Sequence, residues 1–180
     1  MHLTSLISLM ILSIVELFLL RKFIIHKEKI ALKSVITSLV FLWIIFIISY
    51  IFKLNVPDVA YILVIITLFM NSYLGYYFNL YYKTKKYDRI QHVLGSFSFA
   101  ILLYFLFSNV FEYGGSKAFK AFYIFLLGVS SGTIHEIIEF INDLKHEEKM
   151  QRGLKDTNLN IVSNIIGSFS ASILAFFVFL

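Results

Sequence analysis

The sequence predicts an all-α fold, a membrane helical bundle with six transmembrane helices and both termini outside. Of the 180 residues, 59% are hydrophobic and only 15% are charged, whereas the apolar fraction of a soluble domain lies near half. The mean hydropathy is +0.81. The apolar residues are gathered in six runs, each close to the about 20 residues that span a hydrocarbon core of about 30 Å. Composition and run length together indicate a polytopic membrane protein.

The six predicted spans follow one another through a single domain, residues 1–180. The first is interpreted as a retained helix, because no positive segment precedes it and no small-residue cleavage site follows it. Glu16 lies within it, and either faces the bundle or extends to the interface near Arg21. Pro57 breaks the helix between spans two and three. The spans are expected at about residues 3–20, 35–52, 61–80, 90–110, 118–141 and 159–179.

Lysine and arginine are distributed unevenly among the loops. Thirteen of the 16 such residues lie in the loops after spans one, three and five. The positive-inside rule places these loops in the cytoplasm and both termini outside. Their expected partners are membrane lipids of the anionic cytoplasmic leaflet and not nucleic acid, because the charges form no single patch. The amino-acid usage is typical of an AT-rich bacterial genome, so the predicted location is a bacterial cell membrane.

Span five carries ionisable side chains in an otherwise apolar helix, namely His135, Glu136, Glu139 and Asp143. A carboxylate deep in a bilayer costs about 2.5 kcal/mol or more, so such groups normally face a bundle interior or a water-filled cavity. The three acids are spaced by three and four residues and therefore share one helix face. This face is expected to point into the bundle.

Two further polar stripes begin spans four and six. Span four starts with Asp88 and His92, and span six contains Asp156, Asn160 and Asn164 at intervals of four. By the predicted topology all three stripes lie at the cytoplasmic side, with Glu136 about 13 Å inward of Lys145 and Asn164 about 13 Å inward of Lys155. They predict a cytoplasm-facing pocket between spans four, five and six. Span three borders it through Asn71 and Tyr76, unless its aromatic end forms an interfacial belt. The candidate substrate-binding residues are Asn71, Tyr76, Asn160 and Asn164.

Two chemistries fit these residue types. In the first, His92, Glu136, Glu139 and Asp156, with His135 as an optional second imidazole, bind a divalent metal cation, such as Zn²⁺ or a Mg²⁺ that bridges to a lipid phosphate. In the second, buried acids work with the imidazole as an acid–base pair or proton relay without metal. The candidate catalytic residues are Asp88, His92, Glu136 and Glu139. HEIIE places a histidine and a glutamate four residues apart but lacks the second histidine of a zincin motif.

A structural interpretation also fits. His92 then sits at the headgroup level, and His135 hydrogen-bonds within the bundle, which is favoured over metal ligation. Glu139 and Asp143 form ion pairs with Lys145 or Arg89. Asn160 and Asn164 join helices by hydrogen bonds worth about 0.6 kcal/mol each. The absence of cysteine excludes disulfides, thiolate metal sites and a cysteine nucleophile.

Four segments carry a family resemblance: NSYLGYYFNLYY, YDRIQHVLGS, HEIIEF and DTNLNIVSNIIGS. They resemble the YjdF-like family of small bacterial inner-membrane proteins and, more loosely, the VanZ-like superfamily, over about residues 70–170. The polar positions of the family correspond to Asp88, His92, Glu136, Glu139, Asp156 and Asn164. Asn160 stands where the family commonly has a second acid, which weakens a fully carboxylate metal site. The VanZ-like resemblance implies a link to glycopeptide resistance but no particular reaction.

Three classes of function follow. The leading one is an integral membrane protein whose pocket binds or acts on an envelope lipid or lipid-linked headgroup. The second is a proton- or cation-coupled transporter, against which the lack of an internal repeat counts. The third is a non-catalytic envelope or glycopeptide-resistance-type protein, which binds a second copy of itself or a partner membrane protein. The lack of a nucleophile motif counts against a covalent enzyme.

Overall fold

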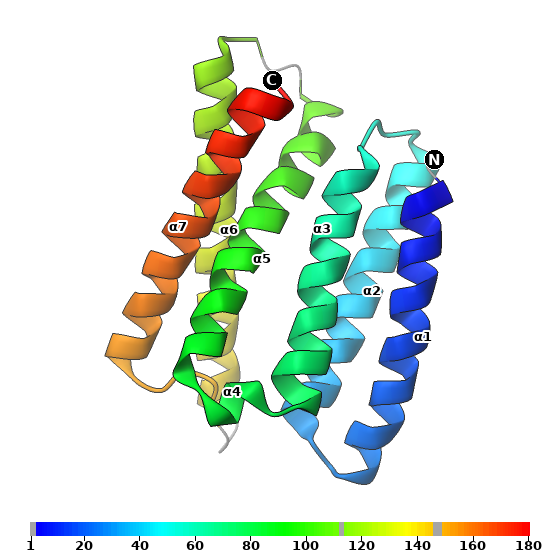
Figure 1. The fold of residues 1–180 in the computed structure, drawn as a ribbon, viewed down its shortest axis with the longest axis vertical. Coiled ribbons are helices and arrows are strands. Elements are labelled where there is room, and N and C mark those ends of the chain that lie inside the picture. The colour runs from blue at the N-terminus through cyan, green and yellow to red at the C-terminus, as the bar shows by residue number, and fades with distance from the viewer. Residues whose placement is uncertain (1–2, 112–113, 146–148) are drawn as a thin grey trace. The chain divides into compact units, whose positions relative to one another are not determined.

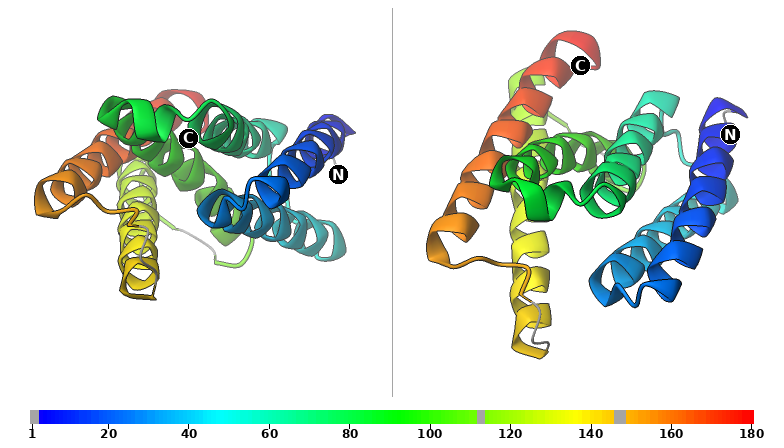
Figure 2. Two further views of the ribbon diagram at one scale, coloured as in Figure 1. Left: turned by 90° about the horizontal axis from the view of Figure 1, so that it is seen from below. Right: turned by 60° about the horizontal axis from the view of Figure 1, so that its bottom comes forward.

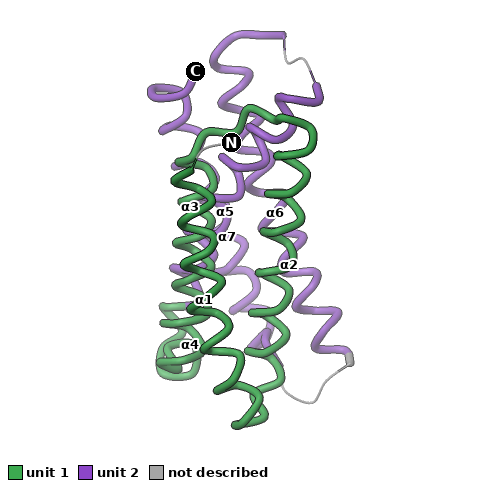
Figure 3. The backbone as a smooth tube through the Cα atoms, turned by 90° about the vertical axis from the view of Figure 1, so that its right-hand side faces the viewer, with its two compact units in different colours: residues 1–87 green, residues 88–180 purple. Residues whose placement is uncertain are grey.

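The computed structural model describes residues 3–111, 114–145 and 149–180, and the chain divides into two compact units, Met1–Tyr87 and Asp88–Leu180 (Figure 3). The described residues form helices and no strand, which confirms the all-α prediction. Six of the helical segments are long and apolar enough to cross a membrane, so the six spans are confirmed as well. The orientation of the termini and the single domain stay predictions.

Most helices extend beyond the predicted spans at their charged ends. Helix α1 (Leu3–Ile25) continues past residue 20, and α2 (Lys29–Ile51) begins at 29 instead of 35. In the same way α5 (Lys85–Ser108) begins at 85 instead of 90, and α7 (Leu154–Val178) at 154 instead of 159. Lysine, arginine and glutamate are good helix formers, so the backbone hydrogen bonds continue where the apolar run has ended. Hydropathy marks the membrane-spanning part of a helix but not the ends of the helix.

Unit 1 is built from the first three spans, with α1 packed against α2 and α3 (Asp58–Phe69) (Figure 1). Pro57 precedes α3 in extended backbone and separates it from α2. The carboxylate of Asp58 accepts hydrogen bonds from the hydroxyls of Thr4 and Ser5, which joins the first turns of α3 and α1. A core cluster of buried residues lies towards the other end of α1. It consists of Leu19, Phe23, Ala31, Val35 and Tyr76.

The third span changes its winding halfway along. After α3 the chain continues as a π-helix, η1 (Met70–Tyr77), instead of running as one α-helix to residue 80. The amide of Phe78 donates to the carbonyl of Tyr73 at 3.0 Å, a bond that spans five residues, and the Tyr87 hydroxyl donates to the carbonyl of Met70 at 2.6 Å. Asn79 then takes the left-handed conformation (φ 59°) and ends the span before the short helix α4 (Leu80–Lys83).

Unit 2 contains α5 from Asp88 onwards, α6 (Lys117–Lys145) and α7, with α6 and α7 side by side in Figure 2. The second half of α5 buries apolar residues such as Ile101 and Leu102, but the end of α6 and the start of α7 are polar inside and apolar outside. The polar side chains Glu136, Glu139 and Asp143 of α6 are buried, whereas the intervening Ile137 and Ile138 are about half exposed. Helix α7 has a similar pattern, because Asp156, Asn160 and Asn164 and most of its small residues are buried, whereas most of its large apolar residues are exposed. This arrangement suits a lipid environment, in which the outer surface of a bundle is as apolar as the tails around it.

Two glycines let the three helices of unit 2 approach closely. A Cβ atom at Gly167 of α7 would overlap the backbone carbonyl oxygen of Val93 in α5, and one at Gly132 of α6 would overlap the side chain of Asn164 in α7. Small residues at such positions allow close helix contacts within membranes. The close approach also brings the polar stripes within hydrogen-bonding distance of one another.

Candidate functional site

The polar residues of unit 2 meet where α5 begins, α6 ends and α7 begins, at the lower end of Figure 1. The structure thus brings together the three stripes that the sequence places at one membrane side. Most of these side chains are buried, with Asp88 partly exposed and His135 exposed, although their helices are otherwise apolar. We call this group the polar cluster. It comprises Asp88, His92, His135, Glu136, Glu139, Asn160 and Asn164.

His92 lies at the centre of the polar cluster. Its Nδ1 is 3.2 Å from Oδ1 of Asn164, and its Nε2 is 3.3 Å from Oε1 of Glu136 and 3.8 Å from Oδ1 of Asp88. When Nδ1–H donates to the amide oxygen, Nε2 turns a lone pair towards two carboxylates. Three acceptors then face one another, so a positive species, either a proton or a metal ion, is needed between them. In metal sites, a histidine that binds the metal through one ring nitrogen is usually oriented by a hydrogen bond from the other ring nitrogen.

His135 and Glu139 approach His92 from α6. Nε2 of His135 is 3.4 Å from Oε1 of Glu139, and the two imidazole rings are 5.5 Å apart in an edge-on arrangement. One ligand atom each from His92, His135 and Glu139 all lie within 4.8 Å of one another. Two atoms bound to a tetrahedral Zn²⁺ at about 2.1 Å are about 3.4 Å apart, so the three side chains would have to close by up to about 1.4 Å around a metal. Two imidazoles and one carboxylate are a donor set that zinc and other first-row metals use.

The metal-capable group differs from the predicted ligand set. His135 belongs to it, although the sequence favoured a hydrogen bond within the bundle for this residue. Two predicted ligands lie outside it: Asp156, whose carboxylate faces the guanidinium of Arg89 at 3.9 Å, and Glu136, whose Oε1 is 3.3 Å from Nε2 of His92. Asn160 donates to the carboxylate of Asp88 at 3.2 Å, so it supports the cluster from α7. The side chain of His135 is 58% exposed while that of His92 is 4% exposed, which leaves one open side at His135.

The segment after the described end of α6 folds back onto this helix. The Asp143 carboxylate accepts hydrogen bonds from the amides of Met150 and Gln151 at 2.7 and 2.9 Å, and its backbone carbonyl accepts one from the Lys149 ammonium. The Gln151 side chain then donates to the carbonyl and to Oε2 of Glu136, at 3.0 and 2.9 Å. Gln151 had no signal in the sequence, because it is a loop residue 15 positions away from its partner.

Removal of this anchor, in Asp143→Ala, is expected to release the returning segment. Hydrogen bonds to a charged acceptor contribute about 1.5–3 kcal/mol each. Loss of one such bond already makes local opening about tenfold more frequent, so the amides of Met150 and Gln151 should exchange at least about tenfold faster. Hydrogen exchange read by mass spectrometry measures this rate. Lys155→Gln, at an exposed position nearby, is the matched control, and equal exchange in the two variants would contradict the anchor.

Two predicted site residues lie in unit 1. Asn71 donates to the hydroxyl of Ser34 at 3.1 Å and accepts a hydrogen bond from Tyr81 at 2.6 Å. Tyr76 is 7% exposed and belongs to the core cluster of that unit. Both are therefore engaged by neighbours within their own unit, and their role in binding a substrate stays a prediction.

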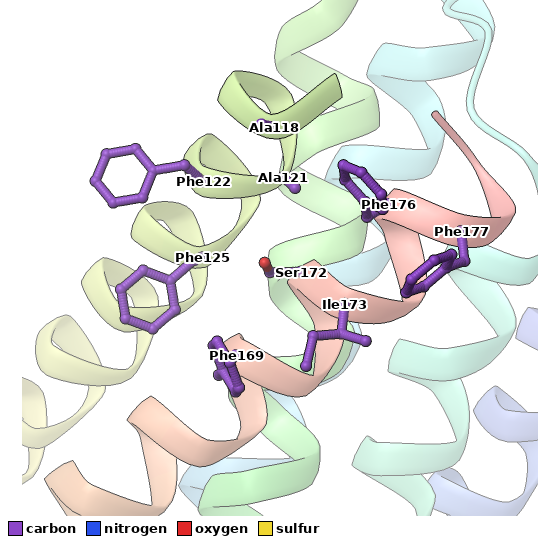
Figure 4. Close-up of a pocket in the computed structure, with 9 residues that line it drawn as sticks. All are labelled: Ala118, Ala121, Phe122, Phe125, Phe169, Ser172, Ile173, Phe176 and Phe177. Atoms are coloured by element: carbon purple, nitrogen blue, oxygen red, sulfur yellow. The ribbon is translucent and has the colours of Figure 1, made fainter. Parts of the chain in front are cut away.

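An apolar cavity of about 480 Å³ lies between α6 and α7, away from the polar cluster (Figure 4). The aromatic rings of Phe122 and Phe125 line it from α6, and those of Phe169 and Phe176 from α7. Phe125 is 11 residues from Glu136 along α6, which corresponds to about 16 Å. Its lining residues are apolar except for Ser172, and none of them is charged.

Comparison with known proteins gives one family and one relative. The family model described as "Predicted membrane protein (DUF2238)" matches residues 5–180. An uncharacterized protein of Thermotoga maritima is 28% identical over 117 residues, which cover 64% of this chain and 61% of that protein. The matched region thus spans less than two thirds of the relative. No solved structure matches the chain.

Proposed function

We propose, from the premise that this chain belongs to the DUF2238 family of predicted membrane proteins, that its polar cluster binds a divalent metal ion and, through it, the phosphate of a lipid or lipid-linked headgroup. The observation that carries the proposal is the approach of His92, His135 and Glu139 to within 4.8 Å of one another. The family membership agrees with the resemblance to YjdF-like proteins, and the looser resemblance to the VanZ-like superfamily stays a prediction.

The charges of the site support a bound cation. Asp88, Glu136, Glu139 and Asp156 bring four carboxylates to one end of unit 2, and the guanidinium of Arg89 lies near Asp156. Uncompensated carboxylates are costly in a membrane. The buried Oε1 of Glu136 also has no hydrogen-bond donor among the described residues. A divalent ion bound by His92, His135 and Glu139 would offset this charge, because the carboxylates of Glu136 and Asp88 also lie beside Nε2 of His92.

The position of the site supports an anionic headgroup as the ligand. The metal-capable group lies near the helix ends, and its open side is at the exposed His135. Lys155 and Arg89 are basic residues at the same end of unit 2. A metal ion with an open coordination position polarises a phosphoryl oxygen, and buried carboxylates beside it are suited to hold or move a proton. A coupled transporter and a partner-binding protein stay predictions, because no described contact favours either over this proposal.

Metal content tests the proposal directly. The protein purified in mild detergent and dialysed against Zn²⁺ or Mn²⁺ is expected to hold about one ion per chain by elemental analysis. His92→Ala, His135→Ala and Glu139→Gln are each expected to lose most of it, because each removes one of three ligands. His26→Ala, an exposed histidine in unit 1, is the matched control and should keep the ion. Equal metal content in all five proteins would overturn the metal site.

The lipid step has its own test. Native mass spectrometry of the metal-loaded protein with phosphatidylglycerol is expected to show a lipid adduct that Glu139→Gln loses. A neutral glycolipid, which lacks a phosphate, should bind equally weakly to both proteins. An adduct that is independent of the metal would separate lipid binding from the polar cluster and limit the proposal to metal binding.

A further inference from the structure

Glu16 is an acid in the middle of α1 that the polar cluster does not include. It is 1% exposed, and the 23-residue helix α1 contains no other acidic residue. Glu16 is therefore surrounded by apolar sequence. Its carboxyl faces η1, where Oε1 lies 2.6 Å from the hydroxyl of Ser72. The structure thus decides between the two sequence alternatives for Glu16, because the side chain is turned into unit 1 and not towards the interface near Arg21.

No charged side chain in the described part of the chain compensates Glu16. Neither α1, α2, α3 nor η1 directs a lysine, arginine or histidine at its carboxyl. Lys22, further along α1, instead places its ammonium 3.7 Å from the ring centre of Tyr77. The second oxygen, Oε2, is buried without a hydrogen-bond donor among the described residues. An ionised carboxylate would therefore stand alone in an apolar interior, which is strongly unfavourable.

The hydrogen bonds of Ser72 fit a neutral acid better than a carboxylate. Its hydroxyl lies 2.6 Å from Oε1 of Glu16 and 3.1 Å from the carbonyl oxygen of Leu68. A serine hydroxyl has one proton, so it cannot donate to both oxygens. When Glu16 carries a proton and donates it to Ser72, the serine proton is available for the Leu68 carbonyl. The protonated form thus satisfies both contacts, and the ionised form satisfies one.

The position of Ser72 is held by the surrounding structure. Ser72 lies in η1, and π-helical turns occur frequently at functional sites. The preceding residue, Asn71, is held by Ser34 of α2 and by Tyr81, and Met70 by the Tyr87 hydroxyl. Three hydrogen bonds to other segments therefore hold the two residues that precede Ser72. One carboxyl and one hydroxyl are too few ligands for Ca²⁺, which takes about six to eight oxygens, so a proton is the ion that fits.

We propose that Glu16 is a proton-binding site of unit 1, in which the carboxyl donates to Ser72 and Ser72 donates to the carbonyl of Leu68. The site is separate from the metal-capable group of unit 2 and does not depend on the function proposed for it. Its ligand is a single exchangeable proton. Release of this proton leaves a carboxylate that the Ser72 hydroxyl alone can stabilise, at the expense of the Leu68 contact.

Infrared difference spectroscopy tests the protonation state without the need for a reagent to reach a buried group. In detergent at neutral pH, the wild-type minus Glu16→Gln spectrum is expected to contain the carbonyl stretching band of a protonated carboxylic acid. Raising the pH should replace this band by the two carboxylate bands. Glu16→Gln should fold normally, because its amide has the shape of the neutral acid. Carboxylate bands at neutral pH in a monodisperse protein would overturn the proposal.

Two serine variants test the hydrogen-bonded chain. Ser72→Ala is expected to shift the carbonyl band of Glu16, because the acid loses its acceptor. Ser163→Ala is the matched control, since Ser163 makes the same kind of bond to the carbonyl four residues earlier, at 2.9 Å in α7. It should leave the band unchanged. A band that is identical in wild type and Ser72→Ala would exclude Ser72 as the partner of the acid.

Discussion

Gly167→Ala is expected to destabilise the protein, whereas Gly95→Ala is expected to stabilise it slightly. A Cβ atom at Gly167 would overlap the carbonyl oxygen of Val93 and lie 2.9 Å from its carbonyl carbon. These atoms are α5 backbone, so α5 and α7 must separate, and overpacking of this kind costs about 1–3 kcal/mol. At Gly95 nothing lies within 4 Å of the added Cβ. At this position alanine should raise the free energy of unfolding by about 0.5–1 kcal/mol, because alanine favours the helical conformation more than glycine does.

Thermal unfolding in mild detergent, followed by circular dichroism, measures both changes. The two variants carry the same substitution in the same unit, so a difference of sign reports the packing and not the chemistry of the replacement. The Gly167 variant should also show weaker metal binding, because the same helix separation moves Asn164 away from His92. Equal melting temperatures for the two variants would mean that α5 and α7 do not pack through Gly167.

Addition of Zn²⁺ or Mn²⁺ is expected to raise the melting temperature of the wild type and of His26→Ala, but not of His135→Ala or Glu139→Gln. A ligand that binds only the folded state stabilises it by about 2.7 kcal/mol at a concentration 100-fold above its dissociation constant. The effect is large because His92, His135 and Glu139 come from two helices, α5 and α6, and unfolding separates them.

A titration with Zn²⁺ or Mn²⁺ at constant ionic strength gives the measurement, and Mg²⁺ provides the comparison with an oxygen-preferring ion. The order of the metals reports the donor set, because imidazole ligands favour zinc over magnesium. A rise of equal size in all four proteins would place the bound ion elsewhere in the chain. A rise with Mg²⁺ alone would shift the site from the histidines to the carboxylates.

The polar cluster was predictable in its location but not in its pairings. The stripes of α5, α6 and α7 are periodic, and each begins or ends beside a basic loop, so their meeting at one end follows from sequence. Which atoms touch depends on helix rotation and on the close approach at Gly132. His135 illustrates the limit, because a small rotation of α6 would turn its ring away from His92, and the sequence contains no measure of that angle.

Unit 1 shows a second limit. The polar and aromatic end of span three was visible in the sequence, but its π-helical winding was not. That winding depends on side-chain contacts from elsewhere in unit 1, such as the Tyr87 hydroxyl on the Met70 carbonyl. The sequence likewise left two environments open for Glu16, the bundle interior and the interface near Arg21. Its partner, Ser72, is 56 residues away, and no local pattern connects them.

The sequence by itself determined the all-helical class, the six spans and the end of the helices at which polar residues gather. These depend on local properties, because each apolar run must satisfy its own backbone hydrogen bonds in lipid, and each buried charge must avoid the tails. The tertiary structure alone decided the grouping of His92 with His135 and Glu139, the return of Gln151 to Glu136, and the contact of Glu16 with Ser72. Each of these contacts joins separate segments, and its geometry depends on how the helices pack.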